Sequence, residues 1–241
     1  MTPGPSGPGR ERAPQRLLVL GANGPTGRLL VQQALDRGFA VNALTRRPES
    51  FPIRHDRLKI VAGDATDPAT VDPALRGCDA VISTIGTAYT WKPVQVYSAS
   101  GRLVVEAMRR AGLRRVIVVT SMGAPRKVHR QGVVQTALMR VLRSTLSRTL
   151  YDDMLRLEQI VSTSGLDWTI VRPPGLSNDP GTGYAVADTR IDEPGMARAD
   201  LAAMLLDQFE DATWIGRTAG VATPGLRLDP VKVIREELLK H

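Results

Sequence analysis

The sequence predicts an α/β protein with a Rossmann-type, doubly wound and mainly parallel sheet, flanked by helices in a single domain. Three observations favour this class. Short apolar runs alternate with segments of helical periodicity from residue 16 to residue 239, which is typical of successive βαβ units. Few polar residues interrupt the apolar runs, as expected of strands buried on both faces. No linker-like break in composition occurs between residues 16 and 235.

Each element is expected from its own local pattern. Apolar runs predict strands at residues 16–22, 40–45, 58–62, 79–85, 114–120, 167–171 and 218–222. Apolar residues at helical spacing predict helices at residues 26–37, 68–76, 93–111, 126–148, 151–164, 199–209 and 230–239. Asp67 and Pro68 suit the start of a helix, and Gly112 and Gly165 suit helix ends. Residues near 172–196 are expected to form an excursion on the substrate side.

The composition excludes several classes of protein. The chain has 241 residues, of which 42% are hydrophobic, so it can bury a sizeable core. Its one cysteine, Cys78, excludes an internal disulfide framework, and its histidines are too far apart in sequence to indicate a metal site. No apolar run is long enough to span a membrane. Residues 1–15 are rich in proline and glycine and predict a disordered tail without a signal peptide, so the expected location is the cytoplasm.

The formal net charge of +8 raises nucleic acid as a partner. Aromatic residues, which stacking platforms for bases need, make up only 4% of the chain, so a small-molecule substrate is favoured over nucleic acid. The basic segment 126–148 also carries an apolar stripe, which indicates a helix packed over the substrate cleft or, less favoured, a surface for membranes or nucleic acid. Nothing in the sequence favours a particular oligomeric state.

A glycine-rich turn is the strongest functional motif. Residues 21–27 read GANGPTG and join the first predicted strand to the first predicted helix. Such glycines permit a tight turn and a close approach of the backbone to a pyrophosphate, which the helix N-terminus attracts. The strand–turn–helix context favours a dinucleotide site over an ordinary glycine-rich turn. The residues expected to line it are Gly21, Asn23, Gly24, Pro25, Thr26 and Gly27.

The end of the second predicted strand indicates which dinucleotide binds. An NAD site would place an acidic residue there to bind the ribose 2′-hydroxyl. This chain instead has Arg46 and Arg47 after Thr45. A guanidinium group suits a 2′-phosphate, which an acid would repel. We therefore expect NADP(H) to be preferred over NAD(H), with Arg46 at the phosphate; the alternative is that both arginines are only solvated surface charges.

Several motifs occur together in a familiar order. They are residues 21–28 (GANGPTGR), 45–48 (TRRP), 63–67 (GDATD), 79–87 (DAVISTIGT), 120–121 (TS) and 164–174 (SGLDWTIVRPP). Over about residues 16–210, the chain resembles the atypical short-chain dehydrogenase/reductase group with an NAD(P)H-binding domain, which includes NmrA-like proteins and the biliverdin-IXβ and flavin reductases. The double proline and residues 181–186 (GTGYAV) most resemble the biliverdin-IXβ branch. Residues 16–241 are accordingly expected to form one NAD(P)-binding Rossmann domain.

The resemblance implies further site residues. Asp64 and Ala65 would flank the adenine, and Ile85, Gly86 and Thr87 would line the path to the nicotinamide ribose. Thr120 and Ser121 would end the fifth strand beside the nicotinamide, with Pro173 and Pro174 behind the ring. Ser121 is the candidate catalytic residue, or else a serine satisfied by local backbone. Tyr184 is a possible substrate-side hydroxyl or a packed aromatic.

The usual Tyr-x-x-x-Lys pair is missing. No tyrosine is followed four positions later by lysine. Tyr151 lies near the expected helix, but Leu155 stands four residues after it, and Met154 occupies the position that aligns with the lysine of the resembled group. Gly175 also stands where the biliverdin-IXβ branch has a histidine. Hydride delivery is the cofactor's chemistry, so the sequence favours an NADP(H)-dependent reductase of a small conjugated acceptor of flavin, quinone or tetrapyrrole type. The alternative is a non-catalytic, redox-sensing NADP(H)-binding regulator; a sugar epimerase is a weaker third.

Overall fold

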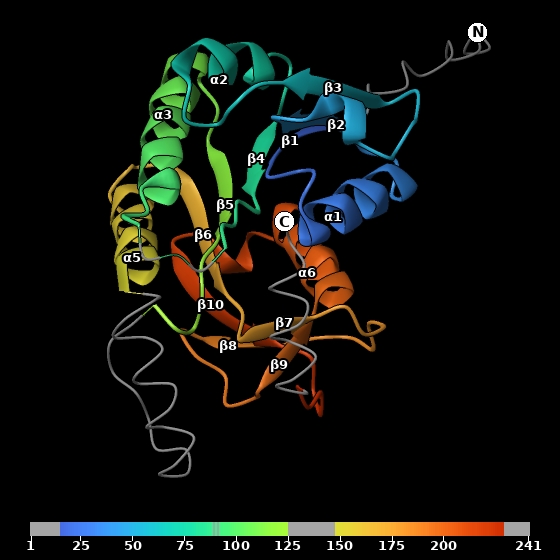
Figure 1. Ribbon diagram of the computed structural model, residues 1–241, viewed down its shortest axis with the longest axis vertical. Coiled ribbons are helices and arrows are strands. Elements are labelled where there is room, and N and C mark those ends of the chain that lie inside the picture. Colours follow the sequence, from blue (N-terminus) through green and yellow to red (C-terminus); the bar gives the residue numbers. More distant parts are fainter. Residues whose placement is uncertain (1–14, 89, 91, 125–147, 229–241) are drawn as a thin grey trace, which may run out of the picture.

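The computed structural model describes residues 15–88, 90, 92–124 and 148–228. Their centre is an eight-stranded sheet with the order β3-β2-β1-β4-β5-β6-β10-β8 (Figure 1). The strands are β1 (Arg16–Leu20), β2 (Ala40–Thr45), β3 (Leu58–Ala62), β4 (Ala80–Ser83), β5 (Arg115–Val119), β6 (Asp167–Arg172), β8 (Ala185–Asp188) and β10 (Arg217–Ala222). All neighbouring strands pair in parallel except β8, which is antiparallel to β10. The predicted doubly wound, mainly parallel sheet is confirmed.

Helices cover both faces of this sheet. They are α1 (Pro25–Asp36), α2 (Pro68–Leu75), α3 (Val96–Ala111), α5 (Arg148–Ser162) and α6 (Arg198–Glu210). Helices α1 and α6 lie together on one face, whereas α2, α3 and α5 cover the other (Figure 1). Alternate residues of β1 enter the two cores: Leu17 and Val19 face α1 and α6, and Leu18 and Leu20 face the other helices.

Local sequence signals explain most helix ends. The Asp67 side chain accepts a hydrogen bond from the backbone N–H of Ala69 and caps α2, with Pro68 at its first position. Gly112 ends α3 in the left-handed region, with φ of 70°. Helix α3 begins at Val96 and not at residue 93 as predicted, because a carboxylate from another helix, Asp153 of α5, accepts hydrogen bonds from the backbone N–H groups of Tyr97 and Ser98.

The substrate-side excursion contains strands that the sequence does not reveal. β7 (Gly175–Ser177) and β9 (Gly195–Ala197) pair in parallel as a separate two-stranded sheet, and β8 extends the main sheet beside β10. These segments are too short to show a strand pattern. The first and fourth strands are also shorter than predicted, since β1 ends at Leu20 and β4 at Ser83. The predicted tail at 1–14, the basic helix at 126–147 and the helix at 230–239 lie outside the described residues.

Candidate functional site

The candidate site lies along one edge of the sheet, where its parallel strands end. The strand order changes direction between β1 and β4, and Leu20 at the end of β1 pairs in register with Leu44 of β2 and Ser83 of β4. On the other side of β4, Val119 at the end of β5 pairs in register with Val171 of β6. The residues that follow these strands therefore converge on the edge where open α/β sheets bind ligands.

Two glycines of the turn after β1 are required by close backbone contacts. Gly21 has φ of +72°, and a Cβ atom there would lie 2.8 Å from the backbone carbon and oxygen of Thr84. A Cβ atom at Gly27 would lie 2.2 Å from the carbonyl oxygen of Gly21. The turn thus folds tightly against both the end of β4 and the first turn of α1, which is the shape that brings backbone N–H groups close to a phosphate.

The N-terminus of α1 has the properties of an anion site. Its N-cap is Gly24, no described side chain caps it, and its first turn holds no acidic residue. Pro25 has no N–H, and the first N–H bonded inside the helix belongs to Arg28, which donates to the carbonyl of Gly24. Unpaired N–H groups and the positive end of the helix dipole remain at this end. A pyrophosphate group would fit this helix terminus.

A polar network joins the glycine turn to the segment after β2. Asn23 Nδ2 donates to Ser50 Oγ at 3.0 Å and to the carbonyl of Arg47 at 3.5 Å, while Arg28 Nε donates to Asn23 Oδ1 at 2.9 Å. Asn23 therefore links two loops that are separate in sequence. Sequence reasoning included Asn23 but missed Arg28 and Ser50; the arginine in the first turn of the helix was the available signal.

Arg46 lies where the 2′-phosphate prediction requires it, after the end of β2. Its side chain is 76% exposed, and its nearest acidic partner is Asp64, with Nη1 4.0 Å from Oδ2. Asp64 follows β3 and accepts hydrogen bonds from the backbone N–H and hydroxyl of Thr66. The backbone bond from Thr66 is the main reason that the pKa of Asp64 lies below its ordinary value; partial burial opposes it, and the Thr66 hydroxyl and the charge of Arg46 lower the pKa further. Such an exposed, long ion pair leaves the guanidinium available to another anion.

The residues after β4 form the middle of the site. Thr84 donates through both its N–H and its hydroxyl to the carbonyl of Leu20, each at 3.0 Å, and so ties the end of β4 to the glycine turn. Ile85 and Ala65 are partly buried against the core on the α3 side, whereas Gly86 and Thr87 are exposed. A Cβ atom at Gly86 would meet no atom of the described residues within 4 Å. Open space therefore borders the chain at Gly86.

At the ends of β5 and β6 the predicted residues lie side by side. Thr120 donates through its N–H to the carbonyl of Val171, and Met122 to that of Pro173, each at 2.9 Å. Ser121 Oγ accepts the N–H of Gly123 at 3.0 Å, and among the described residues no acceptor takes its proton. Pro173 is buried and Pro174 half-buried. Ser121 thus has the local backbone bond that one of its two interpretations expects.

A buried ion pair below these strand ends was missed by sequence reasoning. Glu158 of α5 accepts hydrogen bonds from Thr120 Oγ1 at 2.7 Å and from Arg172 Nε at 2.9 Å, and its second oxygen lies 2.5 Å from Arg172 Nη2. The Thr120 hydroxyl is therefore directed into the protein. An acidic residue on the apolar face of α5, between Met154 and Val161, was the signal that could have revealed it.

The excursion is anchored to α6. Asp200 accepts the N–H groups of Thr182 and Gly183 and the hydroxyl of Thr223. The Tyr184 hydroxyl donates to Asp207 at 2.5 Å, and its ring packs against the α1–α6 core. Burial, followed by the bond to Asp207, raises the pKa of Tyr184 above its ordinary range. Of the two interpretations of Tyr184, the structure matches the packed aromatic.

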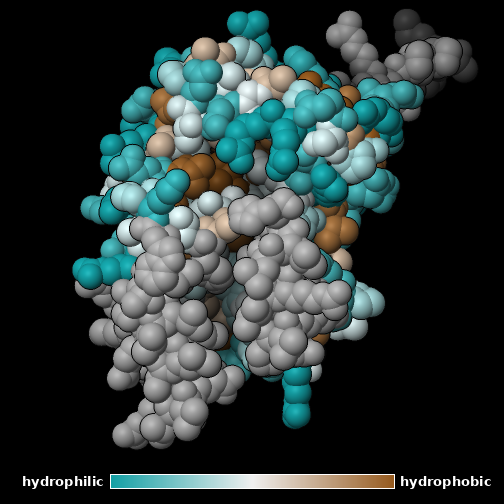
Figure 2. All heavy atoms as spheres, viewed as in Figure 1, coloured by the Kyte–Doolittle hydropathy of each residue, from teal (hydrophilic) through white to brown (hydrophobic). Residues whose placement is uncertain are grey.

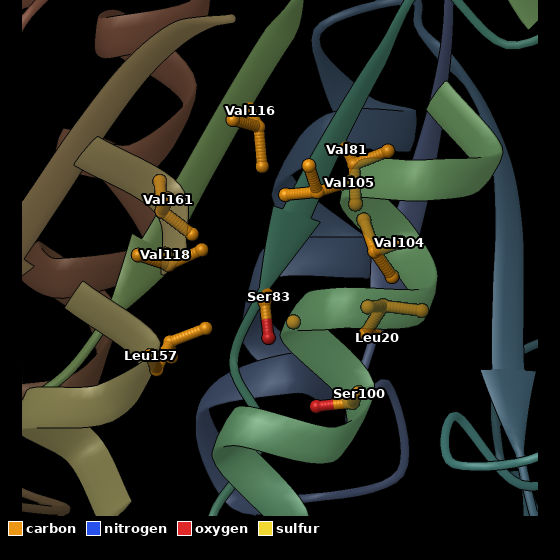
Figure 3. Close-up of a pocket in the computed structure, with 11 residues that line it drawn as sticks. Leu20, Val81, Ser83, Ser100, Val104, Val105, Val116, Val118, Leu157 and Val161 are labelled. Carbon is orange, nitrogen blue, oxygen red and sulfur yellow. The ribbon is translucent and has the colours of Figure 1, made fainter. Parts of the chain in front are cut away.

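A small cavity lies beneath the site and not in it. It is enclosed by β4, β5, α3 and α5, and Figure 3 shows that valine and leucine side chains line it, apart from Ser83 and Ser100. Its volume of about 10 Å³ is room for about one water molecule. This cavity is therefore too small to hold a dinucleotide. Figure 2 shows the side of the molecule seen in Figure 1. Mainly hydrophilic residues cover its upper part, and apolar residues gather in a hollow below them.

Two kinds of feature are absent from the described part of the chain. No helix there is long and apolar enough to cross a membrane. No group of histidine, cysteine or acidic side chains within those same residues could hold a metal ion. The candidate site combines backbone N–H, hydroxyl and guanidinium groups, which are donors suited to phosphates, with the Asn23 amide and the Asp64 carboxylate.

The fold and the glycine turn define a doubly wound protein with a dinucleotide-type site. The chain belongs to the NAD(P)H-binding family, whose model matches residues 21–212. It is 28% identical over 207 residues to the uncharacterized sugar epimerase YhfK of Bacillus subtilis, covering 81% of this chain and 88% of that protein. These findings support the resemblance of its motifs to an atypical short-chain dehydrogenase/reductase-like family.

Other similar proteins include a reductase and a protein solved with NADP. The (4-alkanoyl-5-oxo-2,5-dihydrofuran-3-yl)methyl phosphate reductase of Streptomyces griseus is 31% identical over 157 residues, which are 65% of this chain and 46% of that protein. The structure of a short-chain dehydrogenase/reductase from Veillonella parvula in complex with NADP has a TM-score of 0.72 at 21% identity, covering 88% of this chain and 95% of that one. The second likeness shows the shared fold.

Proposed function

We propose that this protein is an NADP(H)-dependent reductase that transfers a hydride to a small conjugated acceptor of flavin, quinone or tetrapyrrole type. The observation that carries the proposal is the uncapped N-terminus of α1 beside the glycine turn, together with an exposed arginine, Arg46, at the end of β2. The first suits the pyrophosphate, and the second suits the 2′-phosphate of NADP(H). The NADP complex of the Veillonella parvula protein supports the choice of ligand class.

The adenosine end would be bound by the network after β2. Arg46 would pair with the 2′-phosphate, and Asn23 would keep the 47–50 turn fixed beside the glycine turn through its bond to Ser50. Arg28, held by Asn23 Oδ1, would add positive charge to the same corner. Asp64 and Ala65 would flank the adenine. The existing link between the loops would lower the cost of ordering this corner on binding.

The nicotinamide end would be bound at the ends of β4, β5 and β6. Bound NADPH supplies the hydride, so the protein has to orient the ring and the acceptor. Ile85, Gly86 and Thr87 would follow the dinucleotide across the edge, where the structure leaves open space at Gly86. Ser121 would donate its hydroxyl proton to the nicotinamide amide or to the acceptor, with Pro173 and Pro174 behind the ring.

Steady-state turnover tests the reductase directly. Purified protein should oxidise NADPH, followed by its absorbance, when flavin, quinone or biliverdin-type acceptors are added one at a time. At least one of these acceptors should be reduced with NADPH consumed in equal amount. Measurable NADPH binding with no turnover across the panel would contradict the reductase.

One observation favours a second candidate, a non-catalytic NADP(H)-binding regulator. Leu155, and not lysine, stands four residues after Tyr151 on α5, so the usual proton relay through tyrosine is not available here. A regulator that senses redox state must bind its partner differently in the two cofactor states. Pull-down with NADP+ and with NADPH would separate the candidates, because equal partner binding in both states excludes the sensor.

The cytoplasm, as a reducing compartment, suits both candidates and the buried Cys78 thiol.

A further inference from the structure

We propose that Glu158 is a positioning residue for hydride transfer, which holds the ends of β5 and β6 in the geometry that the nicotinamide requires. The inference rests on the proposed function and adds to it a residue that does not touch cofactor or acceptor. Three side chains carry it: Glu158 of α5, Thr120 directly after β5, and Arg172 at the end of β6.

The first argument is that Glu158 is closed off from the site. Its side chain is only 9% exposed, and that of Arg172 is 12% exposed. Both of its oxygens are occupied, one by Thr120 Oγ1 and Arg172 Nε and the other by Arg172 Nη2. This two-point contact fixes the plane of the carboxylate relative to the guanidinium. Glu158 can therefore act on a bound ligand only through the residues it holds.

The second argument is that these side chains reinforce the pairing of β5 and β6 where the backbone offers fewer donors. The residues after Arg172 are Pro173 and Pro174, which have no N–H to donate. Two backbone bonds, from Thr120 to the carbonyl of Val171 and from Met122 to that of Pro173, continue the pairing past the end of β5. Glu158 joins the two chains at this place, immediately before Ser121 on one and Pro173 on the other. The ion pair therefore adds a side-chain link between the two backbone bonds, at the point where the prolines supply no N–H.

The third argument is that stability alone does not require this pair. Glu158 lies on the face of α5 that buries Met154, Leu157 and Val161. Replacing a buried ion pair by apolar side chains of similar volume is often neutral or stabilising, because it removes the desolvation penalty. What apolar side chains cannot replace is the fixed direction of the hydrogen bonds. Because the pair lies at the ends of two strands, these fixed hydrogen bonds hold the strand ends relative to one another.

The test compares two double variants on the same two strands. Glu158→Leu/Arg172→Met removes the buried pair, and Arg114→Met/Asp167→Leu, the control, removes the exposed ion pair that joins the beginnings of the same strands. For wild type and both variants, we would measure the melting temperature, the Kd of 2′,5′-ADP as a probe of the adenosine end, the emission lifetime of bound NADPH as a probe of its nicotinamide, and kcat.

The proposal predicts a split between the two ends of the cofactor. In Glu158→Leu/Arg172→Met the Kd of 2′,5′-ADP should stay within about twofold of wild type, while the lifetime of bound NADPH shortens and kcat falls at least about tenfold, since small displacements of reacting groups are costly. The control variant should match wild type in all three. Glu158→Gln, which keeps the shape of the side chain, should keep more of the lifetime and kcat than the double variant.

Three results would overturn the proposal. Wild-type lifetime and kcat in Glu158→Leu/Arg172→Met would show that the pair positions nothing. A parallel loss of 2′,5′-ADP binding and melting temperature, in this variant and in Glu158→Gln, would show a merely structural role. Equal losses in the control variant would show that the effect is not local. The proposed function fails separately, namely if the wild-type protein does not bind NADPH. The emission lifetime of bound NADPH tests the positioning role even without turnover.

Discussion

At the scale of single residues, cofactor choice depends on Arg46. Its guanidinium is exposed and only loosely paired with Asp64. Arg46→Asp should weaken NADPH binding far more than NADH binding, because the new carboxylate repels the 2′-phosphate that NADH lacks. Calorimetric titration of wild type and variant with both nucleotides measures the difference. Equal losses for the two nucleotides would refute the phosphate role, and an unchanged melting temperature is expected since exposed ion pairs contribute little.

Two glycines of the site should respond differently to the same substitution. Gly27→Ala places a methyl group 2.2 Å from the carbonyl oxygen of Gly21, so the turn must shift and stability should fall by about 1–3 kcal/mol. Gly86→Ala meets no neighbouring atom and should leave the melting temperature unchanged. Thermal unfolding of both variants tests this expectation. A stable Gly27→Ala protein would mean that the turn is less tightly packed than described.

The candidate site could be predicted only in part, for a reason visible at the residue scale. The glycine turn, Arg46 and the strand-end residues are contiguous motifs or follow apolar runs, so local pattern placed them. Glu158 and Arg172 are separated in sequence, and only the crossing of α5 over the end of β6 brings them together. Thr120 is expected beside the nicotinamide from the resemblance, but the sequence does not reveal that its hydroxyl donates to Glu158. Side-chain partners of this kind depend on tertiary contacts that one sequence does not display.

At the scale of elements, the start of α3 is set by a residue of α5. The Asp153 carboxylate is fully buried, accepts the N–H groups of Tyr97 and Ser98, and is also bonded to the Ser98 hydroxyl and to Arg156. No capping side chain precedes α3 within the chain. The pattern of apolar residues therefore predicted the existence of α3 but placed its first residue at 93, because the cap comes from another helix.

Asp153→Ala tests this cap. The change leaves two buried N–H groups at the start of α3 without an acceptor and should cost about 2–4 kcal/mol of unfolding free energy. Asp72→Ala serves as the control, since it removes an exposed ion pair to Arg110 in the last turn of the same helix and should cost less than about 1 kcal/mol. Urea unfolding compares them. Equal effects of the two substitutions would contradict the cap.

At the scale of the whole molecule, the doubly wound parallel sheet followed from the sequence pattern, whereas the strands within the excursion near 172–196 did not. Continuous apolar runs separated by helices leave few arrangements other than a doubly wound parallel sheet. Strands β7, β8 and β9 have only three or four residues each, and they form because α6 and β10 hold them. Acidic residues of α6 accept hydrogen bonds from Thr182, Gly183 and Tyr184. No local sequence pattern predicts these contacts.

Global stability should decline at alkaline pH because of Cys78. Burial raises the pKa of this thiol from its ordinary 9.0 to about 12, so between these values the unfolded chain has lost a proton that the folded protein keeps. Unfolding free energy should therefore fall as pH rises above 9, by up to ~1.4 kcal/mol per pH unit. Urea unfolding of wild type and Cys78→Ala from pH 8 to 11 isolates the effect. Parallel pH profiles would show that the thiol is not protected by the fold.

The central claim is that the edge formed by the glycine turn, Arg46 and the ends of β4 to β6 binds NADP(H). The most direct measurement is calorimetric titration of the purified protein with NADPH, NADP+, NADH and NAD+ under identical conditions. The account predicts saturable binding of one dinucleotide per chain, with both 2′-phosphorylated forms binding more tightly than their counterparts. Absence of binding by all four nucleotides, or tighter binding of NADH and NAD+, would contradict it.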